Sequence, residues 1–355
     1  MKKRPDFVIV GIVLSVLLVA CTPAPGAPWP TPVPPPLPTN LIAPTEEPRI
    51  PLKVATYRFV SDGPLFIAYE EGYFAEQGLD VELIDFISSS NEIVPGLVAR
   101  QLDAGAISLS TAVLNAVHQG NNLKYVADKG FLDPASCVVT AWVASKQFLE
   151  SGALANPAMI KGKRVATSAG GINEYSLDLL LAQNGLTQAD IEPMSISQSP
   201  ARVEALRNGS VDVSVLGEPW ITHAVTAGAG EVWVPYSALM PNLSLGVIVF
   251  GPAILEDKPE AGTRFMIAYL RGVQQFNQGK TVRNVEIIAD FTGLDPAEVK
   301  ASCWASFKAD GTIDAESMLA YQEWGLAKGY LDGSLELDQF YDPRFVSEAA
   351  RSIGN

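Results

Sequence analysis

Histidine and cysteine are scarce in this chain, which has two histidines and three cysteines in 355 residues. His118 and His223 both fall in helix-like runs, and neither stands near a serine or cysteine that it could activate. A nucleophilic enzyme needs such a base, so we expect no catalytic residues and no enzymatic activity. Cys137 and Cys303 lie in apolar stretches and predict two separate buried thiols, although an oxidising compartment leaves a single disulfide open. Their number and spacing give neither a disulfide-dense scaffold nor a zinc site.

Signals for bound phosphates and for nucleic acids are also absent. The glycine-rich loop at 168–171 does not follow G-x-G-x-x-G, and no P-loop sequence occurs, so nothing predicts nucleotide chemistry or another cofactor. Acidic residues exceed basic ones, 39 against 25, which gives a net charge of −14. Such a surface repels nucleic acid, and we expect neither a nucleic-acid partner nor a metal site.

Only one hydrophobic run is long. Three basic residues precede Phe7–Ala20, a run of 14 residues that is shorter than the roughly 20 residues of a membrane span and fits a secretory signal. The run ends in Leu18-Val19-Ala20-Cys21, which resembles the lipobox of bacterial lipoproteins. We therefore expect residues 1–20 to be a signal peptide and Cys21 to be the lipidated residue that anchors the mature chain to a membrane. The alternative is an ordinary signal anchor with a chance cysteine.

Proline is concentrated in one segment, since residues 22–51 hold 12 of the 26 prolines. Proline fixes φ and lacks a backbone donor, so this segment forms neither helix nor sheet. We expect residues 21–51 to be the lipidated cysteine followed by an extended tether. The folded part would then begin at residue 52 and contain about 300 residues, enough for two domains.

A pattern of residues returns about 110 positions later. Val54-Ala55-Thr56 returns as Val165-Ala166-Thr167, 111 residues on, and each copy continues through a helix-like run and a Gly-Leu pair into a strand-like segment. An aspartate, Asp103 or Asp212, then leads the next strand-like segment of each copy. A repeat of this length matches the size of one domain, so the sequence predicts two similar domains with a cleft between them.

Short β-branched segments alternate with helix-like runs over residues 52–250. This alternation is typical of α/β folds with doubly wound, mostly parallel sheets. Two strand-like segments, 138–144 and 245–250, flank the second copy and predict crossings between the domains. We therefore expect domain 1 at 52–140 and 245–355, and domain 2 at 141–244. The other candidate strands are 52–57, 80–86, 104–108, 124–127, 164–167, 194–196, 211–216 and 231–234.

The tail after residue 258 has little strand character and predicts a helical C-terminal layer on domain 1. In its last long helix-like run, 315–328, a set of residues recurs at a helical period and predicts core contacts rather than a site. These residues are Ala315, Met318, Leu319, Gln322 and Leu326.

Ligands of open α/β sheets bind at the carboxyl ends of the strands, where loops lead into helix N-termini. Five such loops contain hydroxyls, glycines and aromatic rings. The hydroxyls and amides could simply cap helices, and Trp220 is either a stacking face or a core anchor, whereas Gly170 would let the backbone approach a ligand closely. The candidate ligand-binding residues are Tyr57, Phe59, Asp62, Ser89, Asn91, Ser110, Thr111, Ser168, Gly170, Glu218, Trp220, Tyr236 and Asn242.

Four segments together resemble a known family. They are GPLFIAYEEGYFAEQGLDVELI (63–84), SLSTA (108–112), KGKRVATSAGG (161–171) and LGEPW (216–220). They resemble the solute-binding proteins of ABC importers, within the group of nitrate, taurine, sulfonate and THI5-like pyrimidine binders, over about residues 52–280. The resemblance implies a monomeric, type II periplasmic-binding-protein clamshell outside the cytoplasm. It would capture a small solute and deliver it to the permease subunits of an ABC transporter.

Some members of this group are enzymes, which provides a rival function. The yeast-type pyrimidine synthases use a lysine, a histidine and a cysteine-rich segment, and the related desulfinases use a cysteine after the first strand. The loop 57–64 contains no cysteine, histidine or lysine, so the sequence favours binding over catalysis. A purely structural or adhesive lipoprotein is a third reading.

Two classes of solute stay open. A planar heterocycle of the pyrimidine or flavin-precursor type needs stacking faces and a few hydrogen bonds, and the loops offer Tyr57, Phe59 and Trp220. A small sulfonate, carboxylate or nitrate-like anion needs donors and often a cation, and Arg58 is the one cation in the five loops. We prefer the heterocycle, captured by closure of the domains about the two crossings.

Overall fold

The computed structural model describes residues 48–86, 90–196 and 198–354. The predicted signal peptide, Cys21 and most of the predicted tether lie outside these ranges. The described residues all belong to one compact unit, Glu47–Asn355. Within them, no helix combines the length and the apolar character needed to cross a bilayer.

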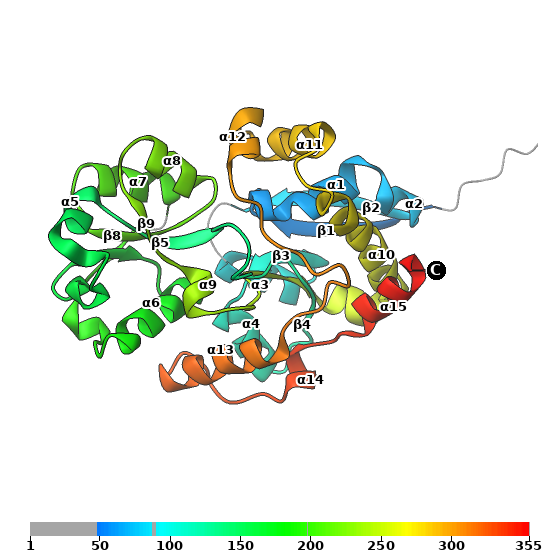
Figure 1. Cartoon of the computed structure of the whole chain (residues 1–355). Coiled ribbons are helices and arrows are strands. Elements are labelled where there is room, and N and C mark those ends of the chain that lie inside the picture. Colours follow the sequence, from blue (N-terminus) through cyan, green and yellow to red (C-terminus); the bar gives the residue numbers. More distant parts are fainter. Residues whose placement is uncertain (1–47, 87–89, 197, 355) are drawn as a thin grey trace, which may run out of the picture. The chain divides into compact units, whose positions relative to one another are not determined.

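Two five-stranded sheets form the described fold, and equivalent strands follow one another in the same order across each sheet (Figure 1). The first sheet has the order β2-β1-β3-β10-β4 and the second β7-β6-β8-β5-β9. The strand β1 is parallel to β2 and β3, and β6 is parallel to β7 and β8, whereas β10 and β5 are antiparallel to both of their neighbours. The predicted α/β class is confirmed. The strands are β1 (Ile50–Thr56), β2 (Leu79–Asp85), β3 (Ala104–Ser108), β4 (Lys124–Asp128), β5 (Thr140–Ala144), β6 (Arg164–Thr167), β7 (Glu192–Ser195), β8 (Val213–Gly217), β9 (Glu231–Pro235) and β10 (Gly246–Phe250).

The sequence repeat corresponds to one hydrogen-bonding unit present in both sheets. The Asp103 carboxylate accepts from the backbone N–H of Lys53 at 2.7 Å, and the Asp212 carboxylate accepts from that of Arg164 at 2.9 Å. Each aspartate also donates its own backbone N–H to the carbonyl of the same partner, at 2.9 Å. An aspartate before β3 or β8 therefore fixes the neighbouring parallel strand, at Lys53 within β1 and at Arg164 at the start of β6, because its side chain satisfies a backbone donor of that strand.

Helices follow most strands and cover the sheets. In the part of the chain up to β10 they are α1 (Gly63–Glu70), α2 (Tyr73–Glu76), α3 (Ser90–Val98), α4 (Thr111–His118), α5 (Lys146–Phe148), α6 (Ile172–Gln183), α7 (Ser199–Arg207), α8 (Trp220–Thr226) and α9 (Tyr236–Leu239). After β10 they are α10 (Pro259–Phe276), α11 (Val282–Thr292), α12 (Pro296–Ala301), α13 (Ala315–Ala327), α14 (Leu337–Phe340) and α15 (Arg344–Ile353).

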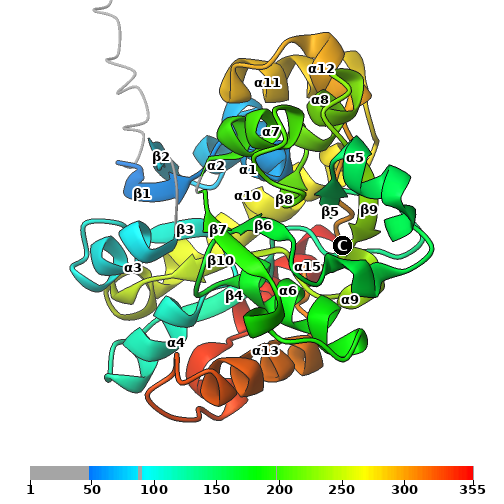
Figure 2. The same cartoon turned by 90° about the vertical axis from the view of Figure 1, so that its left-hand side faces the viewer.

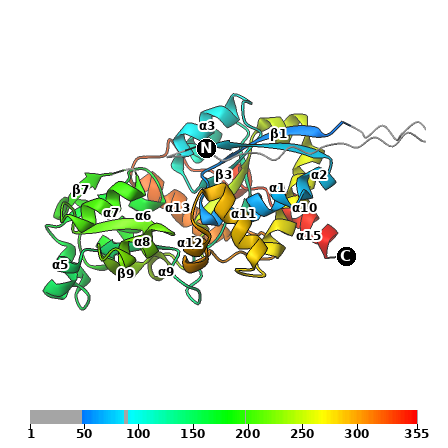
Figure 3. The same cartoon turned by 90° about the horizontal axis from the view of Figure 1, so that it is seen from above.

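The helical tail packs mainly on the first sheet, as the sequence predicts. The helix α10 lies against α1, α2 and α15, and α11 lies against α1 (Figure 3). Phe265 of α10 is fully buried between Phe74 and Phe250, a burial that contributes roughly 1.5–3 kcal/mol. Gly272 allows the close contact with α1, since a Cβ there would lie 2.1 Å from the carbonyl oxygen of Pro64.

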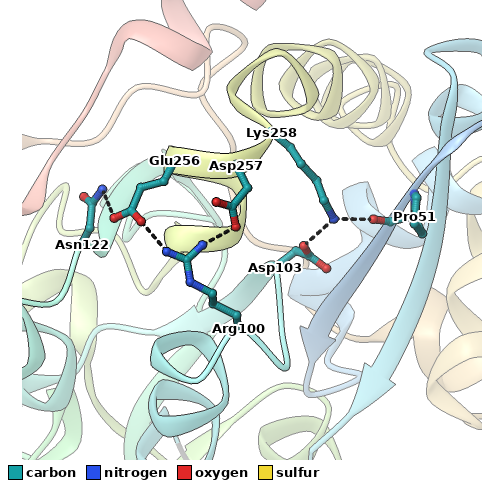
Figure 4. A network of polar contacts seen from close by, with 7 residues as sticks. All are labelled: Pro51, Arg100, Asp103, Asn122, Glu256, Asp257 and Lys258. Carbon is teal, nitrogen blue, oxygen red and sulfur yellow. Dashed lines mark hydrogen bonds and ion pairs between the residues drawn. The ribbon is translucent and has the colours of Figure 1, made fainter.

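Charged contacts fasten the returning chain to the amino-terminal edge of the first sheet (Figure 4). Arg100 pairs with Glu256 and Asp257, which precede α10. Lys258 Nζ lies 3.2 Å from Asp103 Oδ1, so the aspartate that fixes β1 also holds the start of α10. The segment after β10 is thereby attached to the same sheet as residues 50–128.

Two chain segments between the sheets, 129–139 and 240–245, pair with each other by backbone hydrogen bonds, and we call them the ribbon that joins the sheets. The backbone N–H of Leu132 donates to the carbonyl of Leu243, and that of Phe131 donates to the carbonyl of Ser306. Cys137 and Cys303 form a disulfide between this ribbon and the tail, with their Cα atoms 5.8 Å apart. The expectation of two separate buried thiols is therefore wrong. The fold brings together two cysteines that are 166 positions apart, a distance over which sequence spacing carries no pairing information.

Candidate functional site

The carboxyl ends of the parallel strands carry the loops in which the sequence places the site. Two of these loops, one from each sheet, are in contact. Thr111 Oγ1 donates to the carbonyl of Gly170 at 3.0 Å, and Ser110 forms an isolated bridge with Gly171. Ser110 also caps α4, because its Oγ accepts from Ala112 N. The two sheets therefore meet at the edges where α/β folds bind ligands.

The glycine loop after β6 is held by a small network. Gly170 has a φ of 77°, which favours glycine, and its N–H donates to Glu174 Oε2 at 2.7 Å. Asn173 donates to Ser168 Oγ at 3.0 Å and accepts from Tyr236 OH at 3.1 Å. Three of the predicted residues, Ser168, Gly170 and Tyr236, are thus brought together. Tyr236 is buried, so it supports the loop, and its burial raises the pKa of the hydroxyl.

The first loop places one aromatic ring in solvent. Phe59 is 44% exposed, while Tyr57 is buried behind it with the ring centroids 5.6 Å apart. Arg58, the only cation of the predicted loops, has its guanidinium on Asp85, with Nε 2.5 Å from Oδ1. Its charge is thereby partly neutralised. Phe59 is the ring of this loop that can stack on a solute.

Asp62 serves the structure of the loop. Its carboxylate accepts from the backbone N–H of Phe59 at 2.8 Å and lies 2.7 Å from Lys129 Nζ. Both side chains of this ion pair are nearly inaccessible, at 0% and 4% exposure. A buried ion pair with these partners holds the first loop against the ribbon that joins the sheets.

The loop after β8 borders a cavity. Trp220 begins α8, is half-buried, and lies 5.8 Å from the ring of His223 between centroids. Both rings line a cavity of about 530 Å³ together with Pro200 and Glu204 of α7. The cavity lies beside the N-terminal ends of α7 and α8, where the helix dipoles favour acceptor atoms.

Glu218, one residue before the cis proline of this loop, has several internal partners. Its Oε2 accepts from Thr222 N at 3.0 Å, and its Oε1 accepts from Thr222 Oγ1 at 2.9 Å and from Cys303 N at 3.2 Å. The carboxylate therefore caps α8 and contacts the tail beside the disulfide.

Two of the predicted side chains fall outside what the structure describes, and a third residue lies away from the loops of the site. Ser89 lies outside the described residues, and Asn91 lies in α3 with a side chain that is also outside them. Asn242 is exposed and has a φ of 65°, and its N–H donates to the carbonyl of Leu132. It belongs to the ribbon between the sheets.

The structure also shows candidate polar groups that the sequence reasoning missed. Thr167 Oγ1 is buried with no hydrogen-bond partner within the described residues. Its counterpart in the repeat, Thr56, accepts from Arg58 N, so the two copies differ at the position that enters the glycine loop. The Tyr321 hydroxyl of α13 is likewise buried and unsatisfied. The repeat alone could have indicated Thr167, whereas nothing in the sequence indicated Tyr321.

Arg202 of α7 is a buried cation at the same edge of the second sheet. It is 5% exposed, and it donates to the carbonyl of Ile196 at 2.6 Å and to that of Val215 at 3.4 Å. Burial lowers its pKa. Within the described residues, no carboxylate forms an ion pair with Arg202. The same residues contain no group of three or more histidine, cysteine, aspartate or glutamate side chains that could hold a metal ion.

Residues 45–289 match the model of the NMT1-like family. The chain belongs to the NMT1-like family. A curated relative, the riboflavin-binding protein RibY of Chloroflexus aurantiacus, is 26% identical over 273 residues, which cover 74% of this chain and 72% of RibY.

Solved structures show the same fold at low sequence identity. The periplasmic nitrate-binding protein NrtA of Synechocystis PCC 6803 superposes with a TM-score of 0.70 at 15% identity and covers 86% of this NMT1-like chain and 89% of its own. The desulfurization enzyme DSZB superposes with a TM-score of 0.62 at 13% identity, over 86% and 100% of the two chains. The predicted two-lobed fold of periplasmic binding proteins is confirmed, with one sheet in each lobe.

Proposed function

We propose that this NMT1-like protein is the solute-binding component of an ABC importer. It captures one small solute between its two lobes and delivers it to the permease subunits. The fold supports this proposal, and so does the position of the cavity beside Trp220 at the ligand edge of the second sheet.

The preferred cargo is a planar heterocycle of the flavin or thiamine-pyrimidine type. The observation that carries this preference is the pairing of an open aromatic wall, Trp220 and His223, with two helix N-termini. A stacked ring gains contact on its face, while its carbonyl oxygens can accept from the backbone N–H groups at the helix ends. The similarity to a riboflavin-binding protein over 74% of the chain supports the same choice.

Binding is expected to be coupled to closure of the lobes. The contact between Thr111 and Gly170 joins the two ligand edges directly. A solute that touches both edges contacts both lobes only when they are closed, so its binding energy shifts the population toward that state.

A lipid anchor would keep the receptor near its transporter. We propose that Cys21 carries the lipid and that residues 22–49 act as the tether, because Ile50 and Pro51, which the sequence predicts as part of it, belong to β1. At about 3.1 Å per residue, an extended proline-rich segment of this length reaches about 90 Å. Membrane fractionation of the wild-type chain and of Cys21→Ser tests this, because a lipoprotein loses its membrane association when the cysteine is replaced.

A thermal-shift screen of the mature chain with Cys21→Ser tests the cargo. One panel contains riboflavin and thiamine pyrimidines, and the other contains alkanesulfonates, nitrate and carboxylates. A ligand at about 100 times its dissociation constant stabilises the folded state by roughly 2.7 kcal/mol, which is a shift of several degrees. A shift in the first panel alone supports the heterocycle, and no shift in either panel contradicts solute binding of these classes.

A small anion is the second candidate because Arg202 is a buried cation without a carboxylate partner in the described part of the chain. A buried charge without a counter-charge is costly, and an anionic solute would supply one. Arg202→Met should then abolish shifts by the anion panel, whereas shifts by riboflavin should persist.

We propose binding rather than catalysis, although the fold is shared with the enzyme DSZB. Incubation of the protein with riboflavin and with thiamine pyrimidines, followed by mass spectrometry of the solutes, should return them unchanged. Formation of a product would favour the enzymatic alternative.

A further inference from the structure

The tail helix α13 lies beside α6 of the second lobe (Figure 2), and polar and aromatic side chains join the two helices. Trp324 Nε1 donates to Asp178 Oδ2 at 2.7 Å, and Lys328 Nζ lies 3.0 Å from the same oxygen. The ring of Tyr175, also on α6, lies 5.6 Å from that of Tyr321 and 5.3 Å from that of Trp324 between centroids. These contacts join two segments that are about 150 positions apart in the chain.

The same part of the tail is attached to the first lobe. Asn115 of α4 donates through Nδ2 to the carbonyl of Tyr330 at 2.7 Å and accepts at Oδ1 from Asp332 N at 3.1 Å. A Cβ at Gly325 would lie 3.4 Å from Cγ2 of Thr111, so α13 passes close to the start of α4. The segment from Trp324 to Tyr330 is therefore held on one lobe while it bonds the other.

Glu174 accepts hydrogen bonds from its own lobe and from the tail, and it is only 4% exposed. From its own lobe it accepts from Gly170 N at 2.7 Å and from Gln188 Nε2 at 3.0 Å. From the tail it accepts from Tyr330 OH at 2.9 Å and lies 3.2 Å from Lys328 Nζ. One carboxylate thus connects the tail to the glycine loop of the candidate site.

We propose that Trp324, Lys328 and Tyr330 form a latch that holds the lobes closed, and that Glu174 is the positioning residue through which the latch orders the glycine loop. This inference rests on the proposed function, because it concerns the release of the captured solute. When the lobes part, the latch must separate from Glu174 and Asp178. Contacts made only in the closed state slow opening, and contacts within one lobe do not. Solute release therefore depends on residues that do not touch the solute.

The test compares variants of the latch with a matched control. Lys328→Ala removes the charge that bridges the lobes, and Trp324→Phe keeps a ring but removes the donor to Asp178. Lys161→Ala is the control, since Lys161 pairs with Asp190 at 3.1 Å inside the second lobe. Each protein is measured for riboflavin dissociation by stopped-flow fluorescence and, without solute, for hydrogen exchange of the amides at 168–174.

We expect each latch variant to release riboflavin about 3- to 10-fold faster than wild type, as the loss of one partly buried charged hydrogen bond implies. Exchange at 168–174 should also be faster in both variants, and the control should match wild type in both measurements. In a Glu174→Gln background, Lys328→Ala should have less than its full effect, because the two side chains act as one unit.

Wild-type dissociation and wild-type exchange in both latch variants would overturn the proposal. Equal acceleration in the Lys161 control would do so as well, because it would show a general loss of stability. If riboflavin does not bind the wild-type chain, the cargo proposal fails, and the exchange measurement still decides the latch because it needs no solute.

Discussion

Replacing Trp220 with alanine tests the aromatic wall of the cavity. Trp220 is half-buried, packs against the core of the second lobe and lines a cavity of about 530 Å³. Stacking of one base-like ring on one aromatic side chain contributes about 1–3 kcal/mol. At about 1.4 kcal/mol for each factor of ten, Trp220→Ala should weaken riboflavin binding about 5- to 150-fold. The free energy of unfolding should fall by about 1–2 kcal/mol, because the half-buried ring also packs against the core.

The assay is a fluorescence titration with riboflavin, paired with denaturant unfolding of the same proteins. Trp220→Phe should recover part of the affinity, because it restores a stacking face. The control is Trp142→Leu, since Trp142 is fully buried in β5. This variant should lose about 2–4 kcal/mol of stability with little change in affinity. Unchanged affinity of Trp220→Ala together with a large loss of stability would refute the reasoning, because Trp220 would then be a core residue.

Further predictions concern stability. Replacing both Cys137 and Cys303 with alanine should lower the free energy of unfolding by about 2–4 kcal/mol in denaturant titrations, because the disulfide closes a long loop; an unchanged midpoint would contradict this. Gly272→Ala should cost at least about 1–3 kcal/mol, since its Cβ would meet the carbonyl of Pro64 at 2.1 Å, and a wild-type melting temperature would contradict the close packing of α10 on α1. Burial raises the pKa of Asp128 to about 7, and the hydrogen bonds from Ser244 and Gly130 offset this only partly. An unfolded aspartate titrates near pH ~3.9, so the folded state binds this proton more tightly, and the group lowers the free energy of unfolding as the pH rises from about 4 to 7. Asp128→Asn should flatten that part of the pH dependence, and an identical slope in the variant would count against a buried, protonated Asp128.

The repeat explains why the fold could be predicted from the sequence. The aspartates at 103 and 212 make the same backbone hydrogen bond in both sheets, so the pattern that marks the repeat also builds it. The strands could be placed because β-branched residues and turn residues alternate locally, and local patterns carry that information.

The arrangement of the site was less accessible to sequence reasoning. Loops after parallel strands could be named, and Thr111, Gly170 and Trp220 do lie at the ligand edges. The pairing of Cys137 with Cys303 and the contact of α13 with α6 depend on tertiary packing between distant segments. Asp62 and Glu218 looked like ligand acceptors, but the structure gives both carboxylates several internal partners. Such partners are invisible in a list of loop residues.

Capture of a planar solute between the lobes, which we propose for this NMT1-like protein, can be measured directly. The most direct measurement is a titration of the mature wild-type chain with riboflavin, followed by its fluorescence and by small-angle X-ray scattering on the same samples. We expect saturable binding of one riboflavin per chain. The radius of gyration should decrease if the lobes of the unliganded protein are open in solution, and should stay the same if they are already closed. The absence of saturable binding would contradict the preferred cargo, and binding accompanied by an increase in the radius of gyration would contradict capture by closure.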